Sequence, residues 1–447
     1  YGLKLPGAAS GISVAFGVEQ RTEKLQLDSD VAFTTGDLSG QGGPVIGVQG
    51  KYTVKDIYGE FRLPIFDKAP AAHLLSVNGS VRHSDYSTNT KTDSFGVGVE
   101  YAPISTVRLR GSFQRAVRAP NVHDLFAAQG NGLFNMAADP CAGPNPTATL
   151  QQCQRTGLSA AQYGSALLNS PAGQYNFLGG GNNNLRPEKS DSQTLGIVFE
   201  PFRNFTATLD YFDIQIEDVI SVLPPNITLQ RCLTNGEFCN LIQRDVAGTL
   251  WANPAGRIVA TNANIAQGGT TGIDIALNYS GKFGGGWGTY NINFIGTRLQ
   301  RNDLEPVPDG GTFDCTGLHG LTCGVPSPKW RHKARFSWTT PWNADLSLTW
   351  RQLNAVQHEG ISGQPLLLAA INPIDQELAK RDYVDIAASW QATKQLTLRG
   401  GINNLFDKDP PISNSNVLSA TFGNANTYPQ VYDALGRRVF LNATYKF

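Results

Sequence analysis

The stretch Arg437-Arg-Val-Phe-Leu-Asn-Ala-Thr-Tyr-Lys-Phe447 shows a two-residue alternation that decides the fold class. One face of a strand here carries apolar side chains, namely Val439, Leu441, Ala443, Tyr445 and Phe447. The other face carries Arg438, Asn442, Thr444 and Lys446, with Phe440 as the exception. Successive side chains of a strand point to opposite faces, so this strand suits a wall between lipid and water.

The composition is compatible with a membrane β-barrel and gives no sign of a helical membrane protein. Charged residues make up 16% of the 447 residues, and the formal net charge is zero. A neutral balance gives no general attraction to nucleic acid. The longest apolar runs, such as Leu366–Ile371, fall far short of the roughly 20 residues of a membrane helix. The mean hydropathy of −0.23 does not exclude a barrel, because alternating strands average out their apolar face.

Strand patterns bounded by turn residues recur along the whole chain. Many are longer than the five or six residues usual in soluble proteins and reach the about 9 to 11 that a tilted membrane strand needs. The predicted strands, about 14 in number, are Ile12–Gln26, Gln49–Pro64, His73–Ser87, Thr92–Ala102, Val107–Val117, Ser190–Glu200, Phe205–Ile220, Ala260–Ser280, Trp287–Gln300, Lys329–Thr339, Asp345–Val356, Arg381–Ala392, Gln395–Phe406 and Arg437–Phe447.

The connections between these strands alternate between short and long. Short ones include Pro103–Thr106, Pro201–Asn204 and Thr393–Lys394. The long ones are Leu27–Val48, Arg118–Lys189, Ser221–Val259, Arg301–Pro328, Gln357–Lys380 and Asp407–Gly436; only Thr88–Lys91 is short at a long-loop position. Short turns at one end and long loops at the other are typical of an outer-membrane barrel, and a soluble sandwich has no reason to sort its loops this way. The sequence therefore predicts an all-β fold, an antiparallel transmembrane β-barrel with long extracellular loops.

Alternation within the strands assigns charged side chains to the lumen. A charge on the lipid face at mid-depth costs about 2–4 kcal/mol, so Arg108, Arg110, Arg351 and Arg399 are predicted to face inward. Two interpretations remain for these arginines. They are solvated wall residues or counter-ions to acidic groups in the lumen, or they contact a ligand directly.

Six cysteines form three close pairs in the long loops: Cys141 with Cys153, Cys232 with Cys239, and Cys315 with Cys323. Local pairs in loops predict disulfides in an oxidising compartment. The alternative is zinc, and it stays open for the third pair because His319 lies between its cysteines. In the same loops, Ser159–Asn169 has helical spacing, and Phe238–Arg244 is expected to form a single helical turn.

Three stretches resemble TonB-dependent outer-membrane receptors. The first runs Gly111-Ser-Phe-Gln-Arg-Ala-Val-Arg-Ala-Pro-Asn-Val-His-Asp-Leu-Phe126, the second is Asn184-Leu-Arg-Pro-Glu-Lys-Ser190, and the third is Asn403-Asn-Leu-Phe-Asp-Lys408. Gly436-Arg437 and the final Tyr445-Lys446-Phe447 follow in the family's order. The family motif residues, among them Pro120, Pro187, Glu188, Asn404 and Asp407, are interpreted first as barrel architecture and only second as ligand contacts.

The resemblance implies a barrel of about 22 strands around an N-terminal plug. Residues 1–447 then correspond to the C-terminal part of that barrel, with Tyr1–Leu5 as the tail of an earlier strand; these five residues lack the features of a signal peptide. A chain of this kind is expected to form an open or loosely closed sheet and not to work as an energised importer by itself. The implied location is the bacterial outer membrane, and the implied partners are membrane lipid, a nutrient ligand, and the TonB complex through the N-terminal part.

The resulting hypothesis is TonB-energised uptake of a scarce nutrient, such as an iron chelate, cobalamin or an oligosaccharide. A passive porin or structural barrel is the first alternative, and an outer-membrane enzyme is the second. No catalytic constellation, cofactor motif or metal site is recognisable, and no nucleic-acid partner is expected. The long loops contain aromatic residues that could stack on a ligand and arginines that could bind an anionic group. These candidates are Arg118, Phe134, Arg155, Tyr163, Tyr175, Phe177, Trp251 and Tyr428. The alternative for each is packing of one loop on another.

Overall fold

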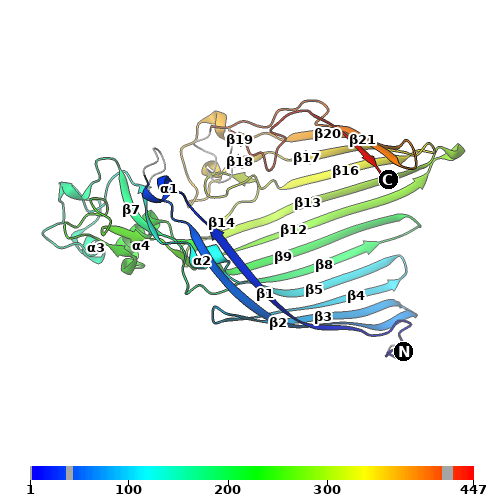
Figure 1. Ribbon diagram of the computed structural model, residues 1–447, viewed down its shortest axis with the longest axis horizontal. Helices are drawn as coiled ribbons and strands as arrows, with labels where there is room; N and C mark the ends of the chain where they lie inside the picture. Colours follow the sequence, from blue (N-terminus) through cyan, green and yellow to red (C-terminus); the bar gives the residue numbers. More distant parts are fainter. Residues whose placement is uncertain (1–2, 37–43, 415–425) are drawn as a thin grey trace.

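A computed structural model describes residues 3–36, 44–414 and 426–447, and its main feature is one large antiparallel sheet. The sheet has 15 strands, and its order follows the sequence from β1 at one edge to β22 at the other, with the short β14 paired to β13. Among the described residues β1 and β22 do not pair, so the sheet is a curved, open wall (Figure 1). The strands along its path are β1 Ser13–Leu27, β2 Val48–Ala69, β3 Ala72–Tyr86, β4 Thr90–Ile104, β5 Val107–Arg118, β8 Glu188–Phe199, β9 Phe205–Val222, β12 Asn262–Lys282, β13 Thr289–Glu305, β16 Trp330–Thr339, β17 Ala344–Leu353, β20 Arg381–Gln391, β21 Leu396–Asn403 and β22 Arg438–Tyr445.

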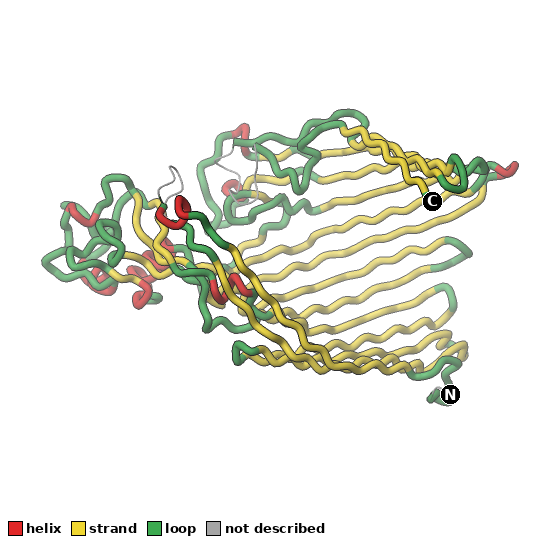
Figure 2. Tube along the Cα trace, viewed as in Figure 1, coloured by secondary structure: helices red, strands yellow, loops and turns green. Residues whose placement is uncertain are grey.

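Each predicted strand is present in this wall, and the sorting of the connections is confirmed. Short turns lie at one end of the strands and long loops at the other (Figure 2). Strand β2, with 22 residues, exceeds its predicted bounds, whereas β12 has the predicted length of 21 residues and is shifted by two. Since about 9 to 11 tilted residues cross the hydrocarbon, these strands extend well beyond it. The expectation for Tyr1–Leu5 as a strand tail lies partly outside the described residues.

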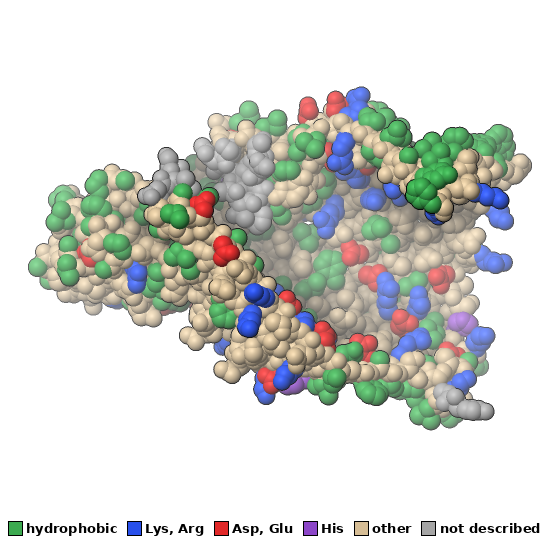
Figure 3. Space-filling model, in the orientation of Figure 1, with side chains coloured by type: hydrophobic (Ala, Val, Ile, Leu, Met, Phe, Trp, Pro, Cys, Tyr) green, Lys and Arg blue, Asp and Glu red, His purple; other side chains and the backbone are tan. Residues whose placement is uncertain are grey.

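The two faces of the wall differ as the alternation predicts. Large apolar side chains on one face are exposed, such as Phe16 (87%), Leu195 (65%) and Leu441 (82%), because no protein layer covers that face. The opposite face is hollow and carries Lys, Arg, Asp and Glu side chains (Figure 3). We call these the outer face and the inner face. An exposed apolar surface repeated on strand after strand indicates contact with lipid.

Aromatic rings gather on the outer face at the short-turn end. The ring centroids of Phe283 and Tyr290 lie 4.9 Å apart, and those of Trp338 and Trp342 lie 5.7 Å apart. The indole Nε1 of Trp338 donates to the carbonyl oxygen of Trp287 at 2.7 Å. Amphipathic rings of this kind favour the membrane–water interface, so they mark one border of the apolar belt.

Phe440, the exception in the alternation of the last strand, is explained by the register. Phe440 lies opposite Gly401 on the inner face, and a Cβ at Gly401 would come within 2.7 Å of the Phe440 ring. The guanidinium carbon of Arg399 lies 5.9 Å from the centre of the ring. A glycine therefore makes room for one aromatic ring on an otherwise polar face.

The buried apolar cores lie in the loops and not within the wall. The loops contain two small sheets: β6 Gly130–Asn135, β7 Gln174–Gly179, β10 Ile242–Gln243 and β11 Arg257–Val259 form one, and β15 Leu318–His319, β18 Val356–His358 and β19 Glu377–Leu378 form the other, while β14 Phe313–Asp314 joins the wall. The α-helices are α1 Val31–Thr35, α2 Val122–Phe126, α3 Leu150–Arg155 and α4 Pro225–Asn235. Short 3-10 turns are η1 Ala166–Leu168, η2 Cys239–Leu241, η3 Gly284–Gly286, η4 Glu359–Ile361 and η5 Pro373–Asp375. Within the described ranges, no helix has the length and apolarity needed to cross a bilayer.

The helix predicted at Ser159–Asn169 is wrong, whereas the turn predicted at Phe238–Arg244 is confirmed as η2. In the first case the helix lies earlier, as α3, where Thr149 and Gln152 form a reciprocal cap. Gly164, within the predicted segment, has a φ of +79°, and this left-handed residue interrupts the helical spacing. Only the single turn η1 remains near the end of the predicted segment.

Candidate ligand-binding surfaces

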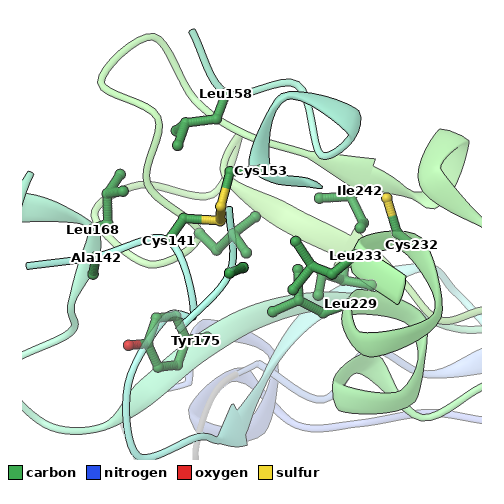
Figure 4. Packing of buried hydrophobic residues seen from close by; sticks show 13 residues of the cluster. Cys141, Ala142, Cys153, Leu158, Leu168, Tyr175, Leu229, Cys232, Leu233 and Ile242 are labelled. Atoms are coloured by element: carbon green, nitrogen blue, oxygen red, sulfur yellow. A yellow bond between two sulfur atoms is a disulfide. The ribbon is translucent and has the colours of Figure 1, made fainter. Parts of the chain in front are cut away.

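Two long connections, residues 119–187 and 223–261, fold into one unit beyond the long-loop end of the wall (Figure 1). We call this unit the loop cap. Strand β7 from the first connection pairs in parallel with β11 from the second, with Phe177 opposite Ile258. Its core draws on both connections and includes the fully enclosed side chains of Leu168, Tyr175, Leu229, Leu250 and Ile258 (Figure 4).

Covalent and ionic links reinforce the loop cap. The predicted disulfides Cys141–Cys153 and Cys232–Cys239 are present, each within one connection. A buried ion pair joins the two connections: Arg244 Nη1 lies 2.7 Å from Asp139 Oδ2, and the two side chains are 1% and 0% exposed. Arg244 also donates to the hydroxyl of Thr156 and to the carbonyl oxygen of Gly248, so its buried charge is well satisfied. These links make the loop cap one packed body rather than two separate loops.

Four of the five aromatic candidates of the loop cap, Phe134, Tyr163, Tyr175 and Trp251, lie in or against its core, mainly as packing residues. Tyr175 is completely buried, and its ring lies 5.8 Å from that of Phe134; burial raises the pKa of its hydroxyl. The hydroxyl of Tyr163 donates to the carbonyl oxygen of Ala148 at 2.8 Å. Trp251 Nε1 donates to the carbonyl oxygen of Leu167 at 3.0 Å, and Phe177 is half-buried. A direct ligand contact by Tyr175 would require the core to open.

The two candidate arginines are engaged with the protein itself. Arg155 Nη1 donates to the carbonyl oxygen of Leu233 at 3.1 Å, across the loop cap. Arg118 binds Glu188 through two hydrogen bonds of 2.5 and 2.6 Å and lies 3.4 Å from Asp124. Its side chain is still 49% exposed, at the rim where β5 ends. Of the two arginines, Arg118 is the one whose guanidinium group is partly accessible to a ligand.

The motif residues hold strand ends together. Glu188 Oε1 also accepts from the backbone N–H of Ile220, so this carboxylate ties β8 to both β5 and β9. The amide of Asn404 accepts from the backbone N–H of Lys408 and donates to its carbonyl oxygen, closing a tight turn after β21. Asp407 Oδ1 accepts from the backbone N–H of Arg437 just before β22. These contacts support the architectural interpretation of the motifs.

A second loop cluster covers the C-terminal strands and contains Tyr428. This residue is completely buried with Val356, Leu378 and Tyr432, and burial raises the pKa of Tyr432. Tyr428 therefore lies apart from the loop-cap aromatics and is enclosed, so in this structure it packs one loop against another. Four of the eight candidates, Phe134, Tyr163, Tyr175 and Trp251, belong to one core or pack against it, and Tyr428 lies in another.

His319 is enclosed in this second cluster. Its ring lies 5.3 Å from that of His358 and 5.8 Å from that of Tyr428, and burial lowers its pKa to about 3. The zinc alternative for the neighbouring cysteines is wrong, because Cys315 and Cys323 form the predicted disulfide. No group of metal-binding side chains occurs in residues 3–36, 44–414 or 426–447.

The inner face of the wall carries its charges in two ways. Some are paired across strands, as predicted for counter-ions: Arg110 binds Asp210 through bonds of 2.7 and 2.6 Å. Arg351 binds Asp385 from the wall and also Asp433 from the last long loop, at 2.8 and 2.6 Å. Arg108 and Arg399 share this face by strand alternation. The four arginines thus lie where the alternation predicted.

Other inner-face cations have no acidic partner among the described residues. Arg331, Lys333 and Arg335 alternate along β16, and Arg399 and Arg438 follow on β21 and β22. We call these five side chains the inner basic patch. A groove of about 500 Å³ beside it is lined by Arg351, Asp385, Tyr432, Asp433 and Arg438. The sequence analysis placed Arg399 on this face but did not name the other four residues, although the alternation Arg331-His-Lys333-Ala-Arg335 carried the necessary signal.

The comparisons with known proteins agree with this architecture. The family model described as "TonB dependent receptor-like, beta-barrel" matches residues 4–405. Among curated proteins, the ferrienterobactin receptor of Escherichia coli (strain K12) is 36% identical over 76 residues, which are 16% of this chain and 10% of the receptor.

Solved structures extend the similarity to nearly the whole chain at low sequence identity. A mutant of the ferric enterobactin receptor PfeA of Pseudomonas aeruginosa matches with a TM-score of 0.62 at 16% identity, covering 98% of this chain and 52% of that protein. The siderophore receptor PirA of Acinetobacter baumannii matches with a TM-score of 0.57 at 17% identity, with coverages of 98% and 52%. The chain therefore spans about half the length of these solved structures, and the likeness concerns the fold.

Proposed function

The chain belongs to the TonB-dependent receptor β-barrel family, and on that premise we propose that it forms the ligand-conducting wall of an outer-membrane receptor for ferric siderophores. Import by the whole receptor would use energy coupled through TonB. Two of the named relatives are called receptors for ferric enterobactin and the third a siderophore receptor, which supports a metal chelate over cobalamin or an oligosaccharide.

The inner basic patch is the observation that supports an anionic ligand. Its five cations lack acidic partners among the described residues, whereas Arg110 and Arg351 on the same face are neutralised. A concave surface with an excess of unpaired cations raises the local concentration of anionic ligands. A ferric chelate with net negative charge fits that surface, and the groove of about 500 Å³ beside it has room for part of such a molecule.

In this proposal the loop cap serves capture at the long-loop end. Its interior aromatic residues shape a rigid body, and its half-buried residues Phe134, Phe177 and Trp251 are the ones placed to reach a ligand without unfolding. Arg118, half-exposed at the rim, is placed to meet an anionic group. A rigid cap reduces the entropy lost on binding, which favours affinity.

The test is binding of ferric enterobactin to the purified chain in lipid nanodiscs, followed by intrinsic fluorescence quenching. The double variant Lys333→Glu/Arg335→Glu reverses two charges of the inner basic patch. Arg203→Glu is the matched control, since Arg203 is exposed in a short turn between β8 and β9. The proposal expects the double variant to bind at least about tenfold more weakly, equivalent to about 1.4 kcal/mol, and the control to bind like the parent.

Two outcomes would contradict the proposal. Equal affinity of the parent and the double variant would remove the inner basic patch from ligand recognition. Binding of uncharged vitamin or sugar ligands but not of ferric chelates would show that the ligand class is wrong.

A further inference from the structure

The outer face of the wall contains an apolar groove between β16 and β21. Its volume is about 470 Å³. The floor is formed where Ala388 on β20 and Gly400 on β21 lie opposite each other. Because these two residues are small, the surface is hollowed between larger neighbours; the walls are Phe336, Trp338, Leu346, Leu348 and Ile386.

The groove lies within the surface that the membrane covers. Its wall residues alternate with inner-face residues such as Ser337 and Ser347, so they point outward. Leu441, beside Gly400 on the next strand, is 82% exposed on the same face. The groove therefore continues the lipid-facing surface of an outer-membrane barrel, and no polar side chain on its outward walls would favour a polar occupant.

The short-turn end of the groove carries the side chains that suit a lipid headgroup. Trp338 and Trp342 form part of the aromatic cluster there, and Trp342 is 50% exposed. Lys394, in the turn between β20 and β21, is exposed. It has no acidic partner in the described part of the chain, and hydrophobic side chains gather near this end of the last strands (Figure 3).

We propose that this groove is a specific site for a membrane glycerophospholipid. One acyl chain lies over Ala388 and Gly400, between the walls formed by β16, β17 and β20. The phosphate lies at the short-turn end, near Lys394, at the level where tryptophan rings border the apolar belt. A chain seated in the groove contacts protein on more than one side, so it dissociates more slowly than lipid on the flat parts of the outer face.

The experiment fills the groove and measures lipid contact. The chain is reconstituted in bilayers that contain phosphatidylethanolamine with a photoreactive group on one acyl chain, and cross-linked peptides are quantified by mass spectrometry. Gly400→Leu adds a side chain on the groove floor, where a Cβ meets only ordinary contacts of 3.4 and 3.5 Å. Gly111→Leu is the matched control, because Gly111 shares the outward alternation of β5, lies outside the groove, and also leaves room for a Cβ.

The proposal expects cross-links concentrated on β17, β20 and β21 in the parent. Gly400→Leu should lower them about tenfold, because the added side chain occupies the space of the acyl chain and removes its contacts, whereas Gly111→Leu should leave them unchanged. Ala388→Leu, on the neighbouring strand, should reproduce the loss if Gly400→Leu fails to insert.

Two results would overturn the proposal. Cross-links spread over all strands in proportion to exposure, with no effect of groove filling, would show that the groove holds no particular lipid. Cross-links on the other outward-facing strands but none on β17, β20 and β21 would show that something other than lipid, such as a second copy of the chain, covers the groove.

Discussion

The wall and the loop cap achieve order by opposite means. The wall has a continuous ladder of backbone hydrogen bonds, an apolar surface turned outward, and charges turned inward. The loop cap has an enclosed apolar core, two disulfides and a buried ion pair, as a small water-soluble domain does. The difference teaches that the solvent sets the pattern, since lipid stabilises the wall from outside whereas the cap must build its own interior.

The largest expected effect concerns the ion pair at the centre of the loop cap. Arg244→Ala leaves the carboxylate of Asp139 buried without its partner, and the expected cost is about 3–5 kcal/mol in local stability of the cap. Limited proteolysis in increasing urea measures this cost. The control is Arg186→Ala, whose ion pair with Asp218 is 69% exposed on the arginine side, so the expected loss is below about 1 kcal/mol. Similar losses for both variants would mean that the cap is not an independently cored unit.

The corresponding test of the wall places a charge on each face in turn. Leu441 points outward and Asn442 inward, opposite Arg399. Leu441→Arg should destabilise insertion by about 2–4 kcal/mol if the residue lies near the midplane, whereas Asn442→Arg should be nearly neutral. Folding yields in lipid bilayers measure the difference. Equal yields for the two variants would mean that the faces are assigned wrongly.

Disulfides should stabilise the loop cap without affecting the wall. Cys141 and Cys153 are separated by 12 residues, and loss of this bridge in Cys141→Ser/Cys153→Ser is expected to cost the cap about 3 kcal/mol. Cys315→Ser/Cys323→Ser is the control, because that bridge lies outside the cap. Non-reducing peptide mass spectrometry verifies the pairings, and the proteolysis assay measures the stability. A loss of strand formation in either variant would contradict the claim that the loop disulfides do not affect the stability of the wall.

The smallest effect is a pH dependence of the second loop cluster, which extends the comparison to another cored loop region. Burial, and to a lesser extent the neighbouring His358, lowers the pKa of His319 to about 3. The unfolded residue takes up a proton below about pH 6.5, so stability is full above that pH and falls as pH decreases towards 3. At pH 5 the expected local loss is about 2 kcal/mol. Hydrogen exchange of residues 318–358 measures the loss, and His319→Phe should abolish it; an unchanged pH profile in that variant would assign the effect to another group.

The sequence predicted the wall well because its constraint is local. Each strand shows a period of two in its own residues, so the strands and both faces followed without knowledge of their partners. The sequence could not explain why an aromatic ring, Phe440, lies on the polar inner face. The explanation depends on Gly401 in the neighbouring strand and therefore on the register of the two strands. The inner basic patch was visible as alternation along β16, but which cations lack partners also depends on register.

The loop cap was largely beyond sequence reasoning. Its contacts join residues far apart in the chain, as in the hydrogen bond from Arg155 to the carbonyl oxygen of Leu233. No periodic pattern in the sequence predicts such contacts. The disulfides were predictable because each bridge is local. The aromatic candidates were found in the right region, but their burial, as for Tyr175, depends on the second connection packing over the first.

Hydrogen exchange of the parent chain in lipid bilayers, resolved by peptide, tests the central claim most directly. The claim is that residues 119–187 and 223–261 form one cooperative unit that is energetically separate from the wall. We predict that peptides of both connections exchange with one shared opening free energy, lower than that of the central strands β8 and β9, because cored loop units open sub-globally. Independent exchange of the two connections, or opening of the cap only together with β8 and β9, would contradict the claim.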